Sequence, residues 1–250
     1  MARGDIEETF GMSIRIALDE LIDTPRTRRV DFEDCDQLEQ RYMGFKLEHV
    51  IRAQFELEPG AKMDYCVDGI EVDCKWTKNF GNWSIPREAV GHICLVVWAN
   101  DSTCEFAVGL IRIREEILVG GNQDKKRNIQ SPEGRSEIRW LIPIAQSLPE
   151  NFLLHLPHAD RSAILGHRGG DDRLLELFRR CDGRILQRHT IESVGQQKDA
   201  ARRARATRPR LLPLGFELLN GHREEQRRRA EELGGPIPEN SDEWVCLRNS

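Results

Sequence analysis

A short segment in the first half of the chain, residues 63–76, constrains the fold more than any other part of the sequence. It reads MDYCVDGIEVDCKW, two runs of alternating polar and apolar residues around Asp68-Gly69. Asp-Gly between such runs is typical of a β-hairpin with a two-residue turn. With that turn, residues whose numbers sum to 137 face each other, so Asp64 is expected opposite Asp73, with Cβ atoms roughly 4.5–5.5 Å apart.

The two faces of this hairpin differ in chemistry. Two carboxylates that face each other repel unless a cation lies between them. Because side chains alternate along a strand, Asp64, Glu71, Asp73 and Lys75 are expected on one face. The opposite face is apolar and is expected to meet the core; it consists of Tyr65, Val67, Ile70 and Val72.

The acidic face has the residue types of a Mg²⁺ site. Mg²⁺ binds oxygen ligands, usually one or two carboxylates together with water and phosphate oxygens. A lysine beside the metal can orient or deprotonate a water molecule, with a pKa lowered by burial and cationic neighbours. A solvent-facing charged hairpin is the alternative.

A second acidic candidate, Glu48, precedes the hairpin in a helix expected over residues 38–57. The apolar stripe of that helix includes Leu47, Val50, Ile51 and Phe55 at helical spacing. Glu48 follows Leu47 directly, so its carboxylate can overhang the edge of the core toward the hairpin. The alternative is an ordinary surface glutamate.

Composition excludes several classes of protein. No apolar stretch approaches the roughly 20 residues that a membrane helix needs, and the N-terminus has no apolar core of a signal peptide. The seven cysteines are odd in number and contain no CxxC pair. This predicts reduced thiols in a cytoplasmic protein without membrane contact, and argues against a zinc site or a disulfide framework.

The charge is distributed unevenly. Residues 1–150 hold 19 Lys/Arg and 27 Asp/Glu, and the remainder holds 18 and 15. The segment 182–210 is the most basic, which fits local binding of DNA or a solvated helix face. Short helices followed by strands in this part predict a small helix-turn-helix domain with a wing. We therefore expect domains at 1–143 and 151–250, joined by a linker at 144–150.

Taken together, Glu48, Asp64 and Asp73-Cys74-Lys75 resemble the active site of PD-(D/E)xK nucleases. The wider sequence resembles the NaeI-type restriction endonucleases. The matching stretches are Met63-Asp64-Tyr65, Val72–Lys75, the run GHICLVVWA at 91–99, Pro132–Arg135, Asn151–Pro157 and Leu177–Arg180.

The resemblance implies a type II restriction endonuclease of a restriction-modification system, which requires Mg²⁺ and acts as a homodimer on a palindromic site in double-stranded DNA. It implies an α/β fold with a restriction-endonuclease-like mixed sheet flanked by helices. A small winged, catabolite-activator-like helix-turn-helix domain would follow, where a second DNA copy binds and activates cleavage. The catalytic residues would be Glu48, Asp64, Asp73 and Lys75. The metal would be held by Asp64, Asp73 and the backbone carbonyl of Cys74.

The candidate DNA-binding residues fall in both parts of the chain. In the second part, Thr190 is expected to cap a helix whose later residues face a groove, where glutamine can read adenine and arginine can bind guanine or phosphate. For Trp83 and Trp98 the alternative is a place in the core. The candidates are Asn79, Trp83, Lys125, Lys126, Arg127, Gln196, Gln197, Lys198, Arg202, Arg203 and Arg205.

These residues predict phosphodiester hydrolysis by direct attack of water, with the metal held by Asp64 and Asp73, the water positioned by Lys75, and Glu48 assisting. Tyr65 is expected to face the core, which disfavours a covalent tyrosyl intermediate, although Tyr42 keeps that alternative open. Two other functions share the sequence features: a nicking nuclease of DNA repair, and a DNA-binding regulator without catalysis. Oligomeric state separates the first from a restriction enzyme, because a two-fold dimer is needed to cut both strands.

Overall fold

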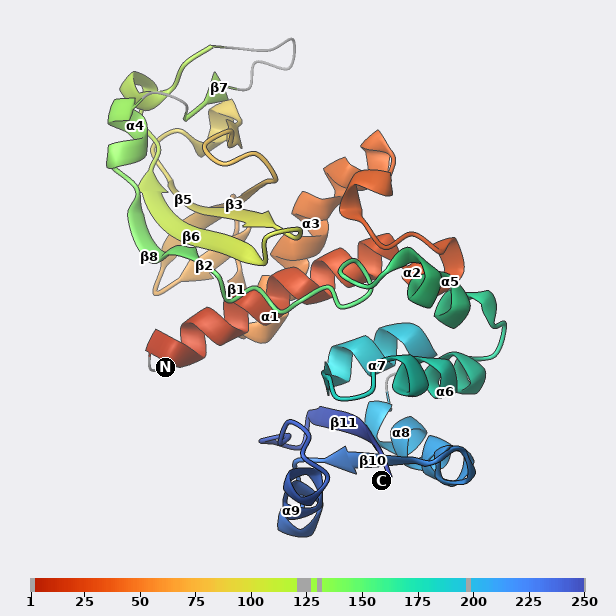
Figure 1. The fold of residues 1–250 in the computed structure, drawn as a ribbon. Coiled ribbons are helices and arrows are strands. Elements are labelled where there is room, and N and C mark those ends of the chain that lie inside the picture. Colours follow the sequence, from red (N-terminus) through yellow and green to blue (C-terminus); the bar gives the residue numbers. More distant parts are fainter. Residues whose placement is uncertain (1–2, 121–126, 130–131, 197–198, 250) are drawn as a thin grey trace. The chain divides into compact units, whose positions relative to one another are not determined.

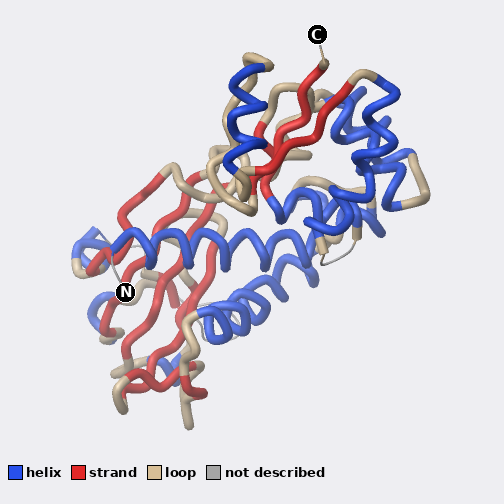
Figure 2. The backbone as a smooth tube through the Cα atoms, turned by 90° about the horizontal axis from the view of Figure 1, so that it is seen from below, coloured by secondary structure: helices blue, strands red, loops and turns tan. Residues whose placement is uncertain are grey.

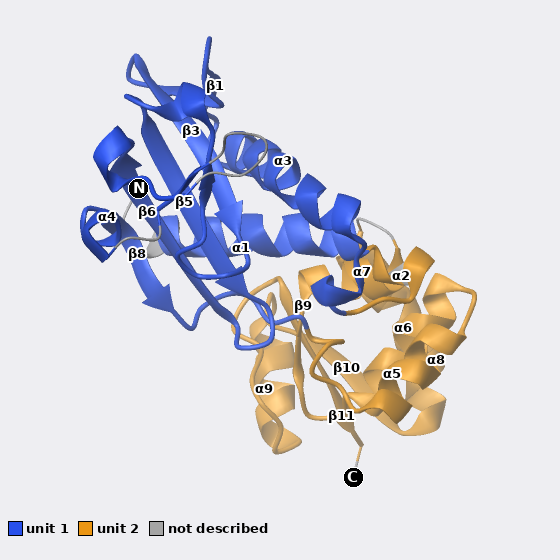
Figure 3. Cartoon of the chain, turned by 90° about the horizontal axis from the view of Figure 1, so that it is seen from above, with its two compact units in different colours: residues 1–22, 31–151 blue, residues 23–30, 152–250 orange. Residues whose placement is uncertain are grey.

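The chain folds into two compact units (Figure 3). The computed structural model describes residues 3–120, 127–129, 132–196 and 199–249. Unit 1 comprises residues 1–22 and 31–151, and unit 2 comprises residues 23–30 and 152–250. The expected linker at 144–150 is not a separate segment, because a strand of unit 1 continues to Ala145. The early segment 23–30 belongs to unit 2, which the sequence did not suggest.

Unit 1 is built on a mixed sheet with the strand order β1-β2-β3-β5-β6-β8. Only β3 and β5 are parallel; the other neighbours are antiparallel. The β2–β3 hairpin has the predicted register, with Tyr65 opposite Val72 and Val67 opposite Ile70. The strands are β1 (Glu58–Pro59), β2 (Tyr65–Val67), β3 (Ile70–Thr77), β5 (Ile93–Asn100), β6 (Glu105–Arg112) and β8 (Arg139–Ala145).

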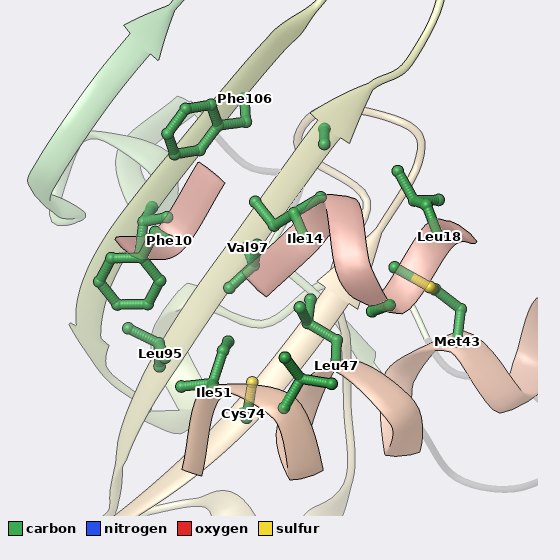
Figure 4. Packing of buried hydrophobic residues seen from close by; sticks show 14 of the residues in the cluster. Phe10, Ile14, Leu18, Met43, Leu47, Ile51, Cys74, Leu95, Val97 and Phe106 are labelled. Atoms are coloured by element: carbon green, nitrogen blue, oxygen red, sulfur yellow. The ribbon is translucent and has the colours of Figure 1, made fainter. Parts of the chain in front are cut away.

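Two long helices, α1 (Arg3–Ile22) and α3 (Gln37–Gln54), cover one face of this sheet (Figures 1 and 2). Asp36 begins α3 with a capping box that it shares with Glu39. The predicted stripe of α3 is confirmed, since Leu47, Val50 and Ile51 are buried. Figure 4 shows these helices packing on the strands through side chains that include Phe10, Ile14, Met43, Leu47, Cys74 and Val97.

The opposite face of the sheet has its own apolar cluster. Trp83, Cys94, Val96 and Ile111 are buried there, together with other residues from the connecting segments. Those segments contain β4 (Ser84–Ile85) paired with β7 (Arg127–Asn128), the helix α4 (Pro132–Ser136) and the 3₁₀ turns η2 (Arg87–Ala89) and η3 (Glu115–Ile117). A further 3₁₀ turn, η1 (Phe32–Asp34), precedes α3. The sheet is thus covered by apolar side chains on both faces.

Unit 2 combines short helices with a three-stranded antiparallel sheet of order β10-β11-β9. Its helices and strands are α2 (Thr24–Thr27), α5 (His158–Gly166), α6 (Gly170–Arg180), β9 (Ile185–Gln187), α7 (Arg188–Gly195), α8 (Ala200–Leu211), η4 (Leu212–Leu214), β10 (Phe216–Asn220), α9 (Glu224–Glu232) and β11 (Glu243–Arg248). In the described part of the chain, no helix is both long and apolar enough to cross a membrane.

The basic segment of unit 2 differs from its prediction. Thr190 does not cap a helix; it is buried inside α7. The next helix, α8, begins after Asp199, whose side chain accepts the backbone N–H of Arg202 at 3.0 Å. Helical periodicity continues across both helices, so periodicity alone does not reveal the break between them.

Helices α6 and α7 are held together by a buried arginine. The guanidinium of Arg173 donates to the carbonyl of Val194 at 2.7 Å and to that of Arg168 at 2.8 Å. It also donates to the side chain of Gln196, 3.0 Å away. The helices approach so closely that a Cβ on Gly170 would lie 2.4 Å from the carbonyl oxygen of Gly195.

Candidate active site

The site lies at the edge of β3, where its partner β2 is too short to cover it. The backbone N–H of Cys74 would face Met63 if the ladder continued, but β2 begins only at Tyr65. The carboxylate of Asp64 takes the place of that strand and accepts the N–H of Cys74 at 2.6 Å. The carbonyl of Cys74 faces the same open edge, because N–H and C=O of one strand residue point to the same side.

Glu71 holds the loop that precedes Asp64 away from the strand pairing. Its carboxylate accepts the backbone N–H groups of Ala61, Lys62 and Met63 at 2.7–3.0 Å. These hydrogen bonds lower the pKa of Glu71. The side chain thus holds the loop between β1 and β2, which supports its omission from the catalytic set.

Lys75 places its ammonium between two oxygens of this edge. Nζ lies 2.6 Å from Oδ1 of Asp73 and 3.0 Å from the carbonyl oxygen of Cys74. Burial opposes the charge, but Asp73 and Asp64 outweigh it and raise the pKa of Lys75. The lowered pKa expected from the sequence is therefore wrong for this arrangement, because the neighbours of Lys75 are anionic.

Asp64 and Asp73 form a close acidic pair. Burial raises the pKa of Asp64 to about 6, and the negative charge of Asp73 adds to this rise, while the N–H of Cys74 opposes it. The other oxygen of Asp73 accepts a hydrogen bond from the thiol of Cys94, 3.4 Å away. Sequence reasoning missed Cys94, because its contact depends on the long-range parallel register that pairs Asp73 with Cys94.

Glu48 approaches this edge from α3. It is half-buried; burial raises its pKa, and the charges of Lys75 and Asp73 act on it. The hydroxyl of Tyr65 donates to the backbone carbonyl of Glu48 at 3.0 Å and so ties α3 to β2. Tyr65 is buried, as predicted, whereas Tyr42 is exposed on α3.

Part of the predicted apolar face is wrong. Tyr65 and Val72 are buried, but Val67 and Ile70 are exposed. The latter two flank the Asp68-Gly69 turn at the tip of the hairpin, where neither apolar cluster includes them.

The oxygen atoms at this edge fit a hard divalent cation. Asp64 and Asp73 supply carboxylates and Cys74 supplies a carbonyl. The ammonium of Lys75 donates to two of these groups, Asp73 and the carbonyl of Cys74. Among the described residues, no group of three or more His, Cys, Asp or Glu side chains is arranged to hold a metal. Two carboxylates with a carbonyl suit Mg²⁺, which keeps several waters and takes phosphate oxygens as further ligands.

The candidate DNA-binding residues of unit 1 lie in different environments. Asn79 is exposed just after β3. Trp83 is fully buried, with its indole N–H donating to the carbonyl of Val97 at 2.9 Å, so the core alternative fits and a DNA contact does not. Arg127 pairs with Glu115 and donates to the carbonyl of Leu118. Lys125 and Lys126 lie outside the described residues.

In unit 2 the candidates are also not equivalent. Gln196 ends α7 and accepts a hydrogen bond from Arg173. Arg203 pairs with Asp171 at 3.0 Å. Arg202 and Arg205 are exposed on α8. Gln197 and Lys198 lie outside the described residues.

A mixed sheet with Asp64 and Asp73-x-Lys75 at its edge has the pattern of a PD-(D/E)xK nuclease. Comparison with known proteins agrees with this class. Residues 5–250 match the family described as restriction endonuclease NaeI. The chain is also 37% identical over 243 residues to the type II restriction enzyme NaeI of Lentzea aerocolonigenes, covering 94% of this chain and 76% of that protein. The chain therefore belongs to the NaeI restriction endonuclease family.

Proposed function

We propose that this protein is a Mg²⁺-dependent type II restriction endonuclease that hydrolyses both strands of double-stranded DNA at a specific site. The observation that carries the proposal is the open edge of β3, where Asp64, Asp73, Lys75 and the carbonyl of Cys74 converge. Membership of the NaeI family supports the nuclease activity.

Each residue at this edge has its own proposed role in hydrolysis. Asp64, Asp73 and the carbonyl of Cys74 would hold Mg²⁺, which supplies charge stabilisation for the attacked phosphate and the leaving oxygen. Lys75 holds its ammonium next to Asp73 and would hydrogen-bond the attacking water or a phosphate oxygen. Glu48 approaches from the helix side and would orient Lys75 or a water ligand. No covalent protein–DNA intermediate is required.

Unit 2 is proposed to be a winged helix-turn-helix domain. Helices α7 and α8 are joined by a four-residue connection between Gly195 and Ala200, as in helix-turn-helix motifs. The two last strands, β10 and β11, are neighbours in the sheet and would form the wing. Helix α8, with exposed Arg202 and Arg205, would enter the major groove. A second DNA copy bound here would activate cleavage.

A homodimer is proposed because one active site cuts one strand, and a two-fold pair cuts both. The exposed face of α3 fits a second copy of this chain. Leu38, Tyr42 and Phe45 lie at helical spacing on it, with exposures of 76%, 56% and 69%. Two such helices packed antiparallel would bring the acidic start of one, at Asp36 and Glu39, near the basic end of the other, at His49 and Arg52.

The seven cysteines support the proposal that the protein functions in a reducing compartment such as the cytosol. None of the seven, all of which are described, forms a disulfide in the structure. Disulfides are rare where glutathione keeps thiols reduced.

Digestion of plasmids of mixed sequence tests the proposed activity. Discrete linear fragments with Mg²⁺, and intact plasmid with EDTA, are the expected result. Open circles without linear product would indicate a nicking nuclease. A gel shift of intact plasmid in Mg²⁺ would indicate a DNA-binding regulator.

A further inference from the structure

Unit 2 contains a cationic cavity that lies beside α8. Its volume is about 470 Å³, and it is bounded by α8, the end of β10, the start of α9 and the start of β11. Four basic side chains line it: Arg205, Arg208, His222 and Arg223. The described residues that line it include no Asp or Glu. A concave site with basic side chains and no acids favours an anionic ligand.

Arg208 is the central residue of this cavity. Its guanidinium lies 5.5 Å above the ring of Trp244, and one Nη donates to the side-chain oxygen of Gln226 at 2.6 Å. Its Nε is buried without a hydrogen-bond partner. Burial and the positive charges of Arg205 and Arg223 lower the pKa of Arg208. A buried donor without a partner is rare and costs free energy.

Two other arginines of α8, Arg203 and Arg210, are paired with acids. Arg203 pairs with Asp171 at 3.0 Å, and Arg210 pairs with Asp172 at 2.7 Å. Both acids come from α6. Within the described part of the chain, Arg205 and Arg208 have no carboxylate partner. Helix α8 therefore has a neutralised side toward α6 and a charged side toward the cavity.

The cavity walls are preformed. The side-chain oxygen of Gln226 accepts both the guanidinium of Arg208 and the backbone N–H of Asn220, 2.9 Å away. The amide of Asn220 donates to the carbonyls of Ser241 and Glu243 at 2.9 and 2.8 Å. These contacts join α8, β10, α9 and β11, so the positive charges are held in place before a ligand binds.

We propose that this cavity binds a phosphate group. Guanidinium groups bind phosphate oxygens in a bidentate manner, and several together suit an anion that carries oxygens on all sides. The phosphate can belong to a DNA backbone or to a small phosphate compound. The place beside α8 favours the DNA backbone, and for that source the inference rests on the proposed DNA-binding role of unit 2. Such a contact would position the duplex without reading its sequence.

Salt-dependent DNA binding by the whole 250-residue chain tests whether the bound phosphate belongs to a DNA backbone. We would measure the anisotropy of a labelled duplex in EDTA for the wild type, Arg223→Met and Arg208→Met. Each substitution is expected to weaken binding about 3- to 10-fold and to reduce the salt slope by about 0.9, the value for one lost phosphate contact. Arg228→Met is the matched control, because Arg228 lies on α9, is exposed and pairs with Glu224 outside the cavity. It is expected to match the wild type.

Calorimetric titration of the same proteins with inorganic phosphate tests whether the cavity binds a small phosphate compound. Lost phosphate binding in both cavity variants, with DNA binding unchanged, would support the cavity as a site for a small phosphate compound. Unchanged affinities for both ligands, or no binding of either by the wild type, would overturn the proposal. Arg223 is exposed, so Arg223→Met remains informative if Arg208→Met does not fold.

The nuclease proposal can fail independently. If Asp73→Ala still cleaves plasmid, the assigned active site is wrong whatever the cavity binds. If Asp73→Ala abolishes cleavage while the cavity variants bind DNA and phosphate as the wild type does, only the cavity proposal fails.

Discussion

The carboxylate of Asp64 accepts the backbone N–H of Cys74 at 2.6 Å, in the position where a longer β2 would have paired with β3. This hydrogen bond links the end of a strand to the chemistry of the site. It gives the backbone N–H of Cys74 an acceptor where no strand pairs with it, and it fixes Asp64 near Asp73. The carbonyl of Cys74 lies on the same edge. The short strand therefore leaves this part of β3 open, at the edge where we propose that a metal and the substrate bind.

Asp64→Asn should separate this structural role from metal binding. The asparagine oxygen can still accept the N–H of Cys74, so we expect a thermal midpoint close to that of the wild type. Metal affinity should fall by at least the roughly 10- to 100-fold that losing an outer ligand partner costs. Plasmid cleavage over a Mg²⁺ titration measures this. Equal Mg²⁺ requirements in both proteins would contradict the assignment.

Lys75→Met should reduce the rate of cleavage while DNA binding persists. The ammonium 2.6 Å from Asp73 is placed to act on a water or phosphate oxygen. Loss of such a group typically costs about 10²- to 10⁴-fold in rate. Single-turnover cleavage measures the rate, and anisotropy in EDTA measures binding. Lys78→Met is the control, because Lys78 pairs with Glu33. A normal rate for Lys75→Met would exclude Lys75 from the reaction.

Arg173→Met should destabilise unit 2. The substitution leaves the buried carbonyl of Val194 and the half-buried carbonyl of Arg168 without their donor. An unsatisfied buried group costs about 1–3 kcal/mol, so we expect a loss of about 1–3 kcal/mol in the free energy of unfolding. Urea denaturation measures the loss. Arg168→Met should have little effect, because its side chain is exposed. Equal stability of the two variants would show that the hydrogen bonds of Arg173 contribute nothing to the stability of unit 2.

The pair Glu217–Arg229 should make stability depend on pH. Hydrogen bonds from Arg229, at 2.7 and 3.1 Å, lower the pKa of Glu217 below 4.5. A lowered carboxyl pKa stabilises the fold above the unfolded pKa, and this stabilisation is lost as pH falls through the folded pKa. Glu217→Gln should thus have a lower thermal midpoint than the wild type near neutral pH.

Scanning calorimetry at neutral and acidic pH checks that dependence. The difference between Glu217→Gln and the wild type should vanish well below pH 4.5. Glu225→Gln, an exposed substitution at the start of α9, provides the baseline. A difference that stays constant with pH would show that the ion pair is not its cause.

Phe45→Glu should dissociate the proposed homodimer. The substitution places a charge in the middle of the exposed apolar face of α3. Sedimentation velocity should give a dimer for the wild type and a monomer for the variant, and cleavage should change from linear to nicked product. Leu212→Glu, at another exposed apolar residue, should remain dimeric. A dimeric Phe45→Glu protein would place the interface elsewhere.

Local patterns allowed the centre of the site to be predicted. The Asp68-Gly69 turn determines the register of its own hairpin, so Asp64 and Asp73 could be placed near each other from the sequence. The helix that contains Glu48 follows from its periodic apolar stripe. These features depend on neighbours within a few residues.

Long-range packing explains what the sequence did not reveal. The pairing of β3 with β5, which brings Cys94 to Asp73, joins segments about 20 residues apart. The segment 23–30 belongs to unit 2 although its sequence neighbours belong to unit 1. The cavity beside α8 gathers residues from two helices and two strands, and of its basic residues only Arg205 was a candidate.

Cleavage by Asp73→Ala tests the central claim most directly. Asp73 contributes one carboxylate to the site and holds the ammonium of Lys75, and it lies on the buried strand β3. Wild type and variant would be incubated with plasmids of mixed sequence and Mg²⁺, after circular dichroism has shown that both are folded. The account predicts discrete fragments from the wild type and intact plasmid from the variant. The same fragments from both proteins would contradict it.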